Sequence, residues 1–211
     1  MSVIIFRHAQ SEWNIHEHLI GWSQPHLHLT DKWKRQAEAL GLRLKWEIEE
    51  GYIQAPRSIS SPDAFRHRET AEIVCDILQI PLGNIIPDNR LAEQCQWDWE
   101  WKVRADIYTP EMCDIINLTK GTHRAPNGGE SQVDVSDRME KWINWLTEKE
   151  THWGFSSSLA ISALIQRLVW GYPWRAFLHS VGNASITEVT KKPLWWWMLR
   201  FGDWSHTLRI K

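Results

Sequence analysis

Short apolar runs alternate with longer stretches of helical periodicity along most of the chain. Continuous apolar runs are typical of buried strands, whereas amphipathic helices repeat their apolar positions every three to four residues. The runs predict strands over residues 2–6, 57–62, 84–88, 157–162, 184–189 and 194–201. Helical spacing predicts helices over residues 30–50, 64–78, 133–148 and 163–171. This alternation predicts a three-layer α/β/α sandwich with a mostly parallel central sheet. Without a repeat or linker-like tract, residues 1–211 are expected to form one domain.

The first predicted strand ends in an unusual pair. The apolar run from Val3 to Phe6 leads directly into Arg7 and His8. An isolated Arg-His pair is most often an ordinary surface feature. In open α/β sheets, however, ligands bind beyond the carboxyl ends of the strands, which is where this pair lies. Arg7 and His8 are therefore the first candidates for a functional site.

Composition excludes several classes of function. With 211 residues, 43% of them hydrophobic, and a net charge of -2, the chain is predicted to attract neither nucleic acid nor anionic membranes. No apolar run approaches the ~20 residues that span a bilayer, and the N-terminus lacks the pattern of a signal peptide. The three cysteines, Cys75, Cys95 and Cys113, have no motif spacing. Their number and spacing fit a reducing cytoplasm, the expected location.

The residues around the Arg-His pair resemble a known signature. The stretch "RHAQSEWN" is similar to R-H-G-x-[TS]-x-x-N of the histidine phosphatase superfamily, the phosphoglycerate-mutase-like proteins. Arg7, His8, Ser11 and Asn14 match it, and Ala9 stands where glycine is usual.

Four further stretches match the same family in chain order. "GWSQPHLHLTDKWKRQAEALG" resembles G-W-S…L-T-x-x-G-x-x-Q-A, and "SSPDAFRHRETAEIV" resembles S-S-P-L-x-R-A-x-x-T-A. "LAEQCQWDWEWK" resembles L-x-E-x-x-x-G-x-W-E-G-K, and "PNGGES" is similar to P-G-G-E-S. Each stretch alone is weak, but their order over nearly the whole chain is specific for the fold. The segment that contains Glu93 and the short middle region resemble the phosphatase branch of the family.

The resemblance implies a phosphoryl-transfer site without a metal or organic cofactor. It assigns His8 as the nucleophile that carries a phosphohistidine, and Arg7 and Arg66 as a clamp on the phosphoryl group. Arginine suits this role because its planar fork binds phosphate bidentately and stays protonated. Arg66 is selected because it lies four residues before Thr70, as in the family, while an extra residue after Pro62 keeps Arg68 as an alternative.

The remaining expected site residues come from the other matched segments. The resemblance makes Glu93 the acid that protonates the leaving oxygen and later activates water. It also implies that Asn14, Ser11, Gly129 and Glu130 bind substrate. Gly129 and Glu130, together with Gly128, are further expected to shape the neighbouring loop.

The chain departs from the family at a second histidine. The family keeps this residue in V-S-H-G-x-x-I-R, but the corresponding stretch is "LAISALIQRLVWG". Either Ser162 replaces the histidine with Arg167 kept in register, or a His-Gly pair is absent between Ser162 and Ala163. On both alignments an imidazole is missing, and neither His179 nor His206 is expected to replace it. Losing one such stabilising group commonly lowers an enzymatic rate ~100- to 1,000-fold.

Tryptophan is a second departure, with 16 residues against 3 Tyr and 5 Phe. Trp33, Trp97 and Trp101 fall where the family pattern has glycine. Glycine in a loop usually marks a positive φ or a close backbone approach, which tryptophan tolerates poorly. The sequence therefore predicts either a rebuilt, aromatic-walled pocket or a disturbed site.

Two functions of different classes follow. The first is a cytoplasmic phosphomonoester hydrolase acting on a small phosphorylated metabolite, preferred to a mutase because the middle region is short. Its activity is expected to be reduced if the second imidazole is missing. The alternative is a non-catalytic or strongly impaired phospho-ligand-binding protein that retains the Arg7–Arg66 clamp.

Two further features carry weaker expectations. His16, His18, His26 and His28 form two His-x-His pairs that could hold zinc on an extended segment, but polar loop histidines are the preferred interpretation. In the predicted strand over residues 194–201, alternate tryptophans are expected to project outward. That strand is therefore a candidate surface for a homodimer.

Overall fold

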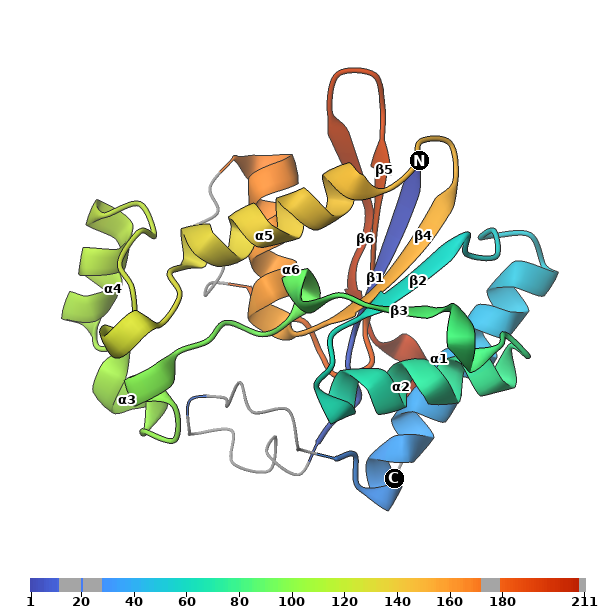
Figure 1. Cartoon of the computed structure of the whole chain (residues 1–211), viewed down its shortest axis with the longest axis horizontal. Helices are drawn as coiled ribbons and strands as arrows, with labels where there is room; N and C mark the ends of the chain where they lie inside the picture. Colours follow the sequence, from blue (N-terminus) through green and yellow to red (C-terminus); the bar gives the residue numbers. More distant parts are fainter. Residues whose placement is uncertain (12–19, 21–27, 172–178, 209–211) are drawn as a thin grey trace.

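The computed structural model describes residues 1–11, 20, 28–171 and 179–208. Its centre is a six-stranded sheet with the strand order β3-β2-β4-β1-β5-β6 (Figure 1). The strands are β1 Ser2–Arg7, β2 Ser58–Ser61, β3 Ile85–Pro87, β4 Thr151–Ser156, β5 Ile186–Lys191 and β6 Trp196–Asp203. The first four are mutually parallel, and β5 and β6 add an antiparallel hairpin at one edge. The predicted mostly parallel sheet is confirmed.

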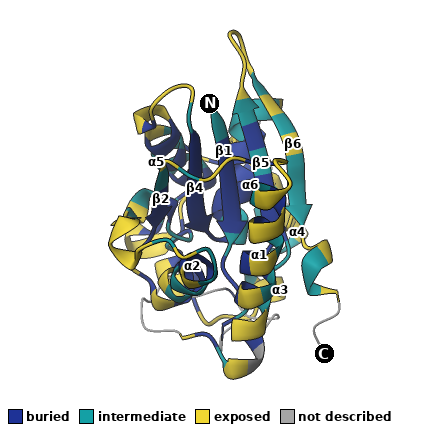
Figure 2. Ribbon diagram, turned by 90° about the vertical axis from the view of Figure 1, so that its right-hand side faces the viewer, coloured by how far each residue is buried: buried dark blue, intermediate teal, exposed yellow. Residues whose placement is uncertain are grey.

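Helices cover both faces of the sheet, which confirms the three-layer architecture. Helices α5 (Gln132–Trp145) and α6 (Ser158–Ile165) pack on one face, and α1 (Asp31–Glu49) and α2 (Phe65–Ile77) on the other. Because side chains alternate along a strand, β1 sends Val3 and Ile5 into the first core and Ile4 and Phe6 into the second. Figure 2 shows this central strand buried between layers whose outer surfaces are exposed.

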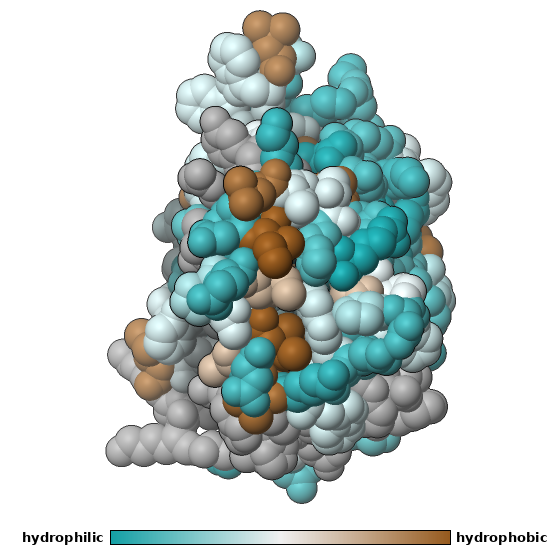
Figure 3. All heavy atoms as spheres, turned by 90° about the vertical axis from the view of Figure 1, so that its left-hand side faces the viewer, coloured by the Kyte–Doolittle hydropathy of each residue, from teal (hydrophilic) through white to brown (hydrophobic). Residues whose placement is uncertain are grey.

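Shorter elements connect these layers. The segment between β3 and α5 contains helices α3 (Arg104–Ile107) and α4 (Pro110–Leu118). The 3-10 turns are Leu82–Asn84, Asn89–Leu91, Trp97–Trp99, Pro126–Gly128 and Ser205–Thr207, and a π-helical turn spans Gln166–Trp170. On the face that carries α3 and α4, hydrophobic side chains form a narrow band among hydrophilic ones (Figure 3).

Helices α1, α4 and α5 each begin directly after a serine or threonine, residue types that commonly cap helix N-termini. Thr109 caps α4 by accepting a hydrogen bond from the backbone N–H of Met112. Ser131 and Asp134 form a reciprocal capping box at the start of α5. Thr30 precedes α1 as expected, although its side chain makes no capping hydrogen bond.

One predicted strand is wrong. Residues 157–162 do not form a strand, because β4 ends at Ser156 and α6 begins at Ser158. The sequence hides β4 because Gly154 and polar residues interrupt its apolar pattern. A Cβ atom at Gly154 would lie 2.8 Å from the Trp142 ring, so glycine there makes room for α5. The apolar run after Ser157 belongs instead to a helix that is buried on nearly all sides.

Edge strand β6 has the predicted alternation. The side chain of Trp197 is exposed, whereas Trp196 is half-buried and packs against the core of α5 and α6. Within the described residues, the fold contains no helix that is both long and apolar enough to cross a bilayer.

Candidate active site

The candidate site lies where three parallel strands end. Arg7 is the last residue of β1 and pairs with Ser156, the last residue of β4. The backbone N–H of His8 continues this pairing by donating to the Ser156 carbonyl at 3.0 Å. Strand β2 ends beside β4 and leads into α2. The carboxyl edge of the sheet therefore gathers residues from β1, from the β4–α6 junction and from α2 (Figure 1).

His8 is held in one tautomer. Its ring is only 4% exposed, and its Nδ1 lies 2.6 Å from the carbonyl oxygen of Ala9. A carbonyl can only accept a hydrogen bond, so Nδ1 carries the proton and Nε2 keeps its lone pair. Burial lowers the pKa of His8 well below its ordinary value, and the charges of Arg66 and Arg7 lower it further. His8 is therefore a neutral imidazole with a nucleophilic Nε2 at neutral pH.

The structure brings Arg66 to this site and leaves Arg68 at the surface. Arg66 projects from the first turn of α2, is 4% exposed, and is close enough to His8 to depress its pKa. Burial lowers the pKa of Arg66 itself, an effect opposed by the carboxylates of Glu93 and Glu100. Arg68 is exposed and pairs with Glu72 at 2.8 Å on the outside of the helix. Arg7 and Arg66 thus flank His8 with two positive charges.

Backbone and hydroxyl contacts fix these side chains. Thr70 accepts a hydrogen bond from the backbone N–H of Ala9 at 3.0 Å and donates to the carbonyl of Arg66 at 2.7 Å. It therefore ties α2 to the turn after His8. The Arg7 guanidinium donates to the carbonyl of Val181 at 2.5 Å. Asn183 donates to the His8 carbonyl at 3.1 Å. The family-like motifs did not single out Val181 or Asn183, because both follow the segments that they match.

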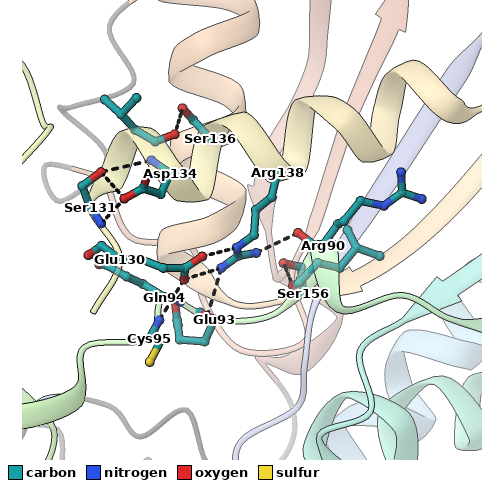
Figure 4. Close-up of polar contacts among 12 residues, drawn as sticks. Arg90, Glu93, Gln94, Cys95, Glu130, Ser131, Asp134, Ser136, Arg138 and Ser156 are labelled. Atoms are coloured by element: carbon teal, nitrogen blue, oxygen red, sulfur yellow. Dashed lines mark hydrogen bonds and ion pairs between the residues drawn. The ribbon is translucent and has the colours of Figure 1, made fainter. Parts of the chain in front are cut away.

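Glu93 lies in the loop after β3, where Arg138 holds the chain. The Arg138 guanidinium donates to the carbonyls of Arg90 at 2.7 Å and Glu93 at 3.0 Å (Figure 4). The half-buried Glu93 carboxylate accepts a hydrogen bond from the backbone N–H of Gln94 at 2.9 Å. Its charge opposes the lowering of the Arg66 pKa that burial causes. This loop therefore brings a carboxylate into the surroundings of Arg66.

Glu130 and Gly129 are fixed by contacts with neighbouring parts of the protein. The Glu130 carboxylate is bound by the Arg138 guanidinium at 2.7 Å and by the backbone N–H of Cys95 at 3.0 Å (Figure 4). A Cβ atom at Gly129 would lie 2.5 Å from the Cβ of Ala125, so only glycine fits. These contacts fit the expected loop-shaping role, and the substrate-binding role of Gly129 and Glu130 stays a prediction.

Two of the three unusual tryptophans have the backbone that glycine favours. Trp97 has φ 42° and Trp101 has φ 70°, both in the left-handed region. Trp33 differs, because it is a buried residue of α1 with no positive φ. A positive φ, expected where the family pattern has glycine, is therefore found in the loop around Glu93 but not at Trp33 in α1.

The structure corrects the alignment at the missing histidine. The residue that follows β4 is Ser157, so "FSSS", not "AISA", corresponds to V-S-H-G. Ser162 lies inside α6, where its hydroxyl donates to the carbonyl of His179 at 2.7 Å. Both alignments at Ser162 are wrong because they assumed a strand over residues 157–162, where the structure has the start of α6.

Sequence reasoning also missed a buried histidine. His67 is fully buried, and its ring centroid lies 4.8 Å from that of His8 with the planes at 75°. Its Nε2 lies 2.7 Å from the hydroxyl of Ser157. The available signal was the "R-H" of "FRHRET", where the family pattern has R-A. The family's histidine is absent from the segment after β4, but the imidazole of His67 lies next to His8.

The structure says less about the other expected residues. Asn14 and the histidines at positions 16, 18 and 26 are outside the described residues. Ser11 is buried and its backbone pairs with that of Leu29. His28 is hydrogen-bonded to Glu69 through its Nδ1. The described part of the chain contains no cluster of histidine, cysteine and carboxylate side chains that could hold a metal ion.

Comparison with known proteins adds an independent finding. The profile of the histidine phosphatase superfamily (branch 1) matches residues 3–203. A glucosyl-3-phosphoglycerate phosphatase of Mycolicibacterium vanbaalenii is 28% identical, covering 89% of this chain and 83% of that protein. A probable phosphoglycerate mutase GpmB of Proteus mirabilis is 29% identical, covering 100% of this chain and 96% of that protein.

A similar fold is found in a solved structure. The phosphoserine phosphatase of Entamoeba histolytica in complex with 3-phosphoglyceric acid superposes with a TM-score of 0.81. The match covers 98% of this chain and 99% of that chain at 18% identity. At this identity the likeness concerns the fold alone.

Proposed function

The chain belongs to the histidine phosphatase superfamily, and from that premise we propose that it hydrolyses small phosphate monoesters through a phosphohistidine at His8. One observation carries the proposal. The buried imidazole of His8 has its proton on Nδ1, bound to the Ala9 carbonyl, and stands close to the charges of Arg7 and Arg66. This arrangement combines an available nucleophile with two cations suited to a phosphoryl group.

The proposed reaction has two steps. Arg7 and Arg66 bind the outer phosphoryl oxygens, and the lone pair of His8 Nε2 attacks phosphorus as the bond to the ester oxygen breaks. Water then attacks the phosphohistidine, and the phosphorus–nitrogen bond breaks to release inorganic phosphate. The charge on the transferred group stays on its outer oxygens, so the two arginines stabilise both steps.

Glu93 is proposed to move the proton. In the first step its carboxyl group would protonate the departing ester oxygen, and in the second its carboxylate would accept a proton from the attacking water. Arg138 and Glu130 support this role by holding the backbone of the Glu93 loop. Asn14 and Ser11 complete the proposed set of phosphate-binding residues.

The proposed substrate class is a small phosphorylated metabolite. The names of two relatives refer to glucosyl-3-phosphoglycerate and to phosphoglycerate, which are small, anionic phosphate esters. A panel of such compounds, including 3-phosphoglycerate and a glucosyl phosphoglycerate, is the first choice for substrate screening. Release of inorganic phosphate would favour the phosphatase over a mutase, which would produce an isomeric phosphate ester instead.

Hydrolysis of p-nitrophenyl phosphate tests the proposed function. The wild-type protein should release p-nitrophenol and a His8→Ala variant should not, because the variant lacks the phosphoryl acceptor. The same assay decides between the two classes of function. Absence of turnover by the wild-type protein, combined with phosphate binding that depends on Arg66, would favour the non-catalytic phospho-ligand binder.

A further inference from the structure

A second buried imidazole lies against the proposed nucleophile. His67 follows Arg66 on α2 and is completely inaccessible to solvent. Its ring meets the ring of His8 edge to face at a centroid distance of 4.8 Å. Its Nε2 is hydrogen-bonded to the hydroxyl of Ser157 at 2.7 Å. Its Nδ1 is buried without a hydrogen-bond partner among the described residues.

This environment opposes a positive charge on the imidazole of His67. Burial lowers the pKa of His67 well below its ordinary value, and the charges of Arg66, His8 and Arg7 act in the same direction. The carbonyl of Ala64 acts in the opposite direction. Burying the polar Nδ1 without a well-placed partner is unfavourable for stability. Such buried and perturbed groups concentrate at functional sites.

An anion in the site would reverse this balance. The charged groups that face His67 are Arg66 on its own helix and Arg7 on β1, and both would be paired with the negative oxygens of a phosphoryl group. The negative charge then favours a proton on the neighbouring imidazole. His67 would take up that proton from solvent as the phosphoryl group binds.

We infer that His67, held by the Ser157 hydroxyl, supplies the second imidazole of the phosphoryl-transfer site from α2 instead of from the end of β4. The inference rests on the proposed function. His67 acts as a positioning residue: its ring packs against His8, and its positive charge stabilises the group transferred to His8. Ser157 occupies the position at the end of β4, and its hydroxyl orients the imidazole of His67 on α2.

Kinetics of variants test this role. A His67→Gln variant should lose ~100- to 1,000-fold in kcat, the usual loss when one electrostatic stabiliser is removed, with a smaller change in KM. Arg68→Gln is the matched control, because Arg68 is the next residue of α2 and its side chain lies on the exposed side with Glu72. This control should retain the wild-type rate. Circular dichroism and thermal unfolding would verify that both variants fold.

A double variant that places the imidazole directly after β4, and not on α2, gives a sharper test. The double variant His67→Ala/Ser157→His should recover much of the activity that His67→Ala loses, because an imidazole again reaches His8. A merely structural role of His67 predicts no such rescue. Failure of the folded double variant to exceed His67→Ala would count against the inference.

Proton uptake tests the inference separately from turnover. Calorimetric titration with orthovanadate in buffers of different ionisation enthalpy should show proton uptake by the wild-type protein and less uptake by His67→Gln. Equal uptake, or full activity of His67→Gln in an enzyme that depends on His8, would overturn the inference and leave the proposed function intact. A wild-type protein without turnover would contradict the proposed function, while proton uptake on vanadate binding would still measure the response of His67.

Discussion

His8 has two neighbours that set its protonation and one that sets its tautomer. Burial lowers the pKa of the His8 ring, Arg66 and Arg7 lower it further, and the Ala9 carbonyl holds the proton on Nδ1. The same two arginines are the groups that would pair with an incoming phosphate. The charges that help to keep His8 neutral are therefore also those proposed to bind the phosphoryl group.

Replacing Arg66 by lysine tests the clamp at this scale. Lysine keeps one positive charge but loses the planar fork that binds two phosphoryl oxygens. Arg66→Lys should therefore lower kcat/KM by ~100- to 1,000-fold for an aryl phosphate. Arg68→Lys should leave kcat/KM unchanged, because its side chain is exposed. Equal kinetics for the two variants would contradict the assignment of Arg66.

The two site histidines should also make stability depend on pH. The pKa of each is lowered in the folded state, so below about pH 6.5 the unfolded chain binds protons that the folded chain does not. The free energy of unfolding should be highest above this pH and fall as the pH drops toward the lowered pKa values. Each histidine contributes up to about 1.4 kcal/mol per pH unit.

Urea unfolding of wild-type protein and His67→Gln, measured at neutral and at mildly acidic pH, checks this dependence. The variant should lose less stability on acidification, because one of the two histidines has been removed. His206, whose pKa is also lowered, is present in both proteins and cancels in the comparison. The same pH dependence in both proteins would contradict a neutral, buried His67.

At the scale of elements, most strands and helices could be predicted from periodicity, but β4 could not. The end of β4 marks the position that corresponds to the family's second histidine. A strand such as β1, which is apolar at every buried position, is visible in sequence. In β4, Gly154 exists to admit Trp142 from α5, and that requirement comes from packing between elements distant in sequence. Because the strand was predicted over residues 157–162 instead, the sequence did not indicate that Ser157 follows a strand or that it contacts His67.

The loop around Glu93 allows a test of backbone conformation. Because Trp97 has a positive φ, Trp97→Gly should be more stable than Trp97→Ala by about 1 kcal/mol. Trp33 lies in a helix, where the order should reverse, with Trp33→Ala more stable than Trp33→Gly by about 1 kcal/mol. Urea unfolding of the four variants measures both differences. The same order of alanine and glycine at both positions would contradict this account.

A tight turn before α5 gives a second test. Gly129→Ala places a Cβ atom 2.5 Å from that of Ala125 and should destabilise the protein by about 1–3 kcal/mol. Gly83→Ala is the matched control, because a Cβ atom there meets nothing within 4 Å and the glycine has no positive φ. Thermal unfolding compares the two. Comparable melting temperatures would mean that the turn at Gly129 is looser than described.

At the scale of the whole molecule, topology assembles a site from segments that are distant in sequence. Motifs identified Arg7, His8, Arg66 and Glu93 individually, and parallel strands explain why the first three share one edge of the sheet. Sequence alone could not supply the contact between His67 and His8. That contact depends on how α2 packs beside β1, which no local pattern encodes.

The homodimer remains a prediction at this scale. Strand β6 is an edge of the sheet, and Trp195 and Trp197 expose more than half of their surface. Sedimentation equilibrium should give the mass of two chains, falling to one chain in the Trp195→Lys/Trp197→Lys variant because charges disfavour edge pairing. A monomeric wild-type protein would contradict the prediction.

The most direct test is a crystal structure with orthovanadate. The account predicts vanadium bonded to Nε2 of His8, with the guanidinium groups of Arg7 and Arg66 on its oxygens and Nδ1 still donating to the Ala9 carbonyl. A vanadate bound elsewhere, or one bound without both arginines, would contradict the claim that this strand end receives a phosphoryl group.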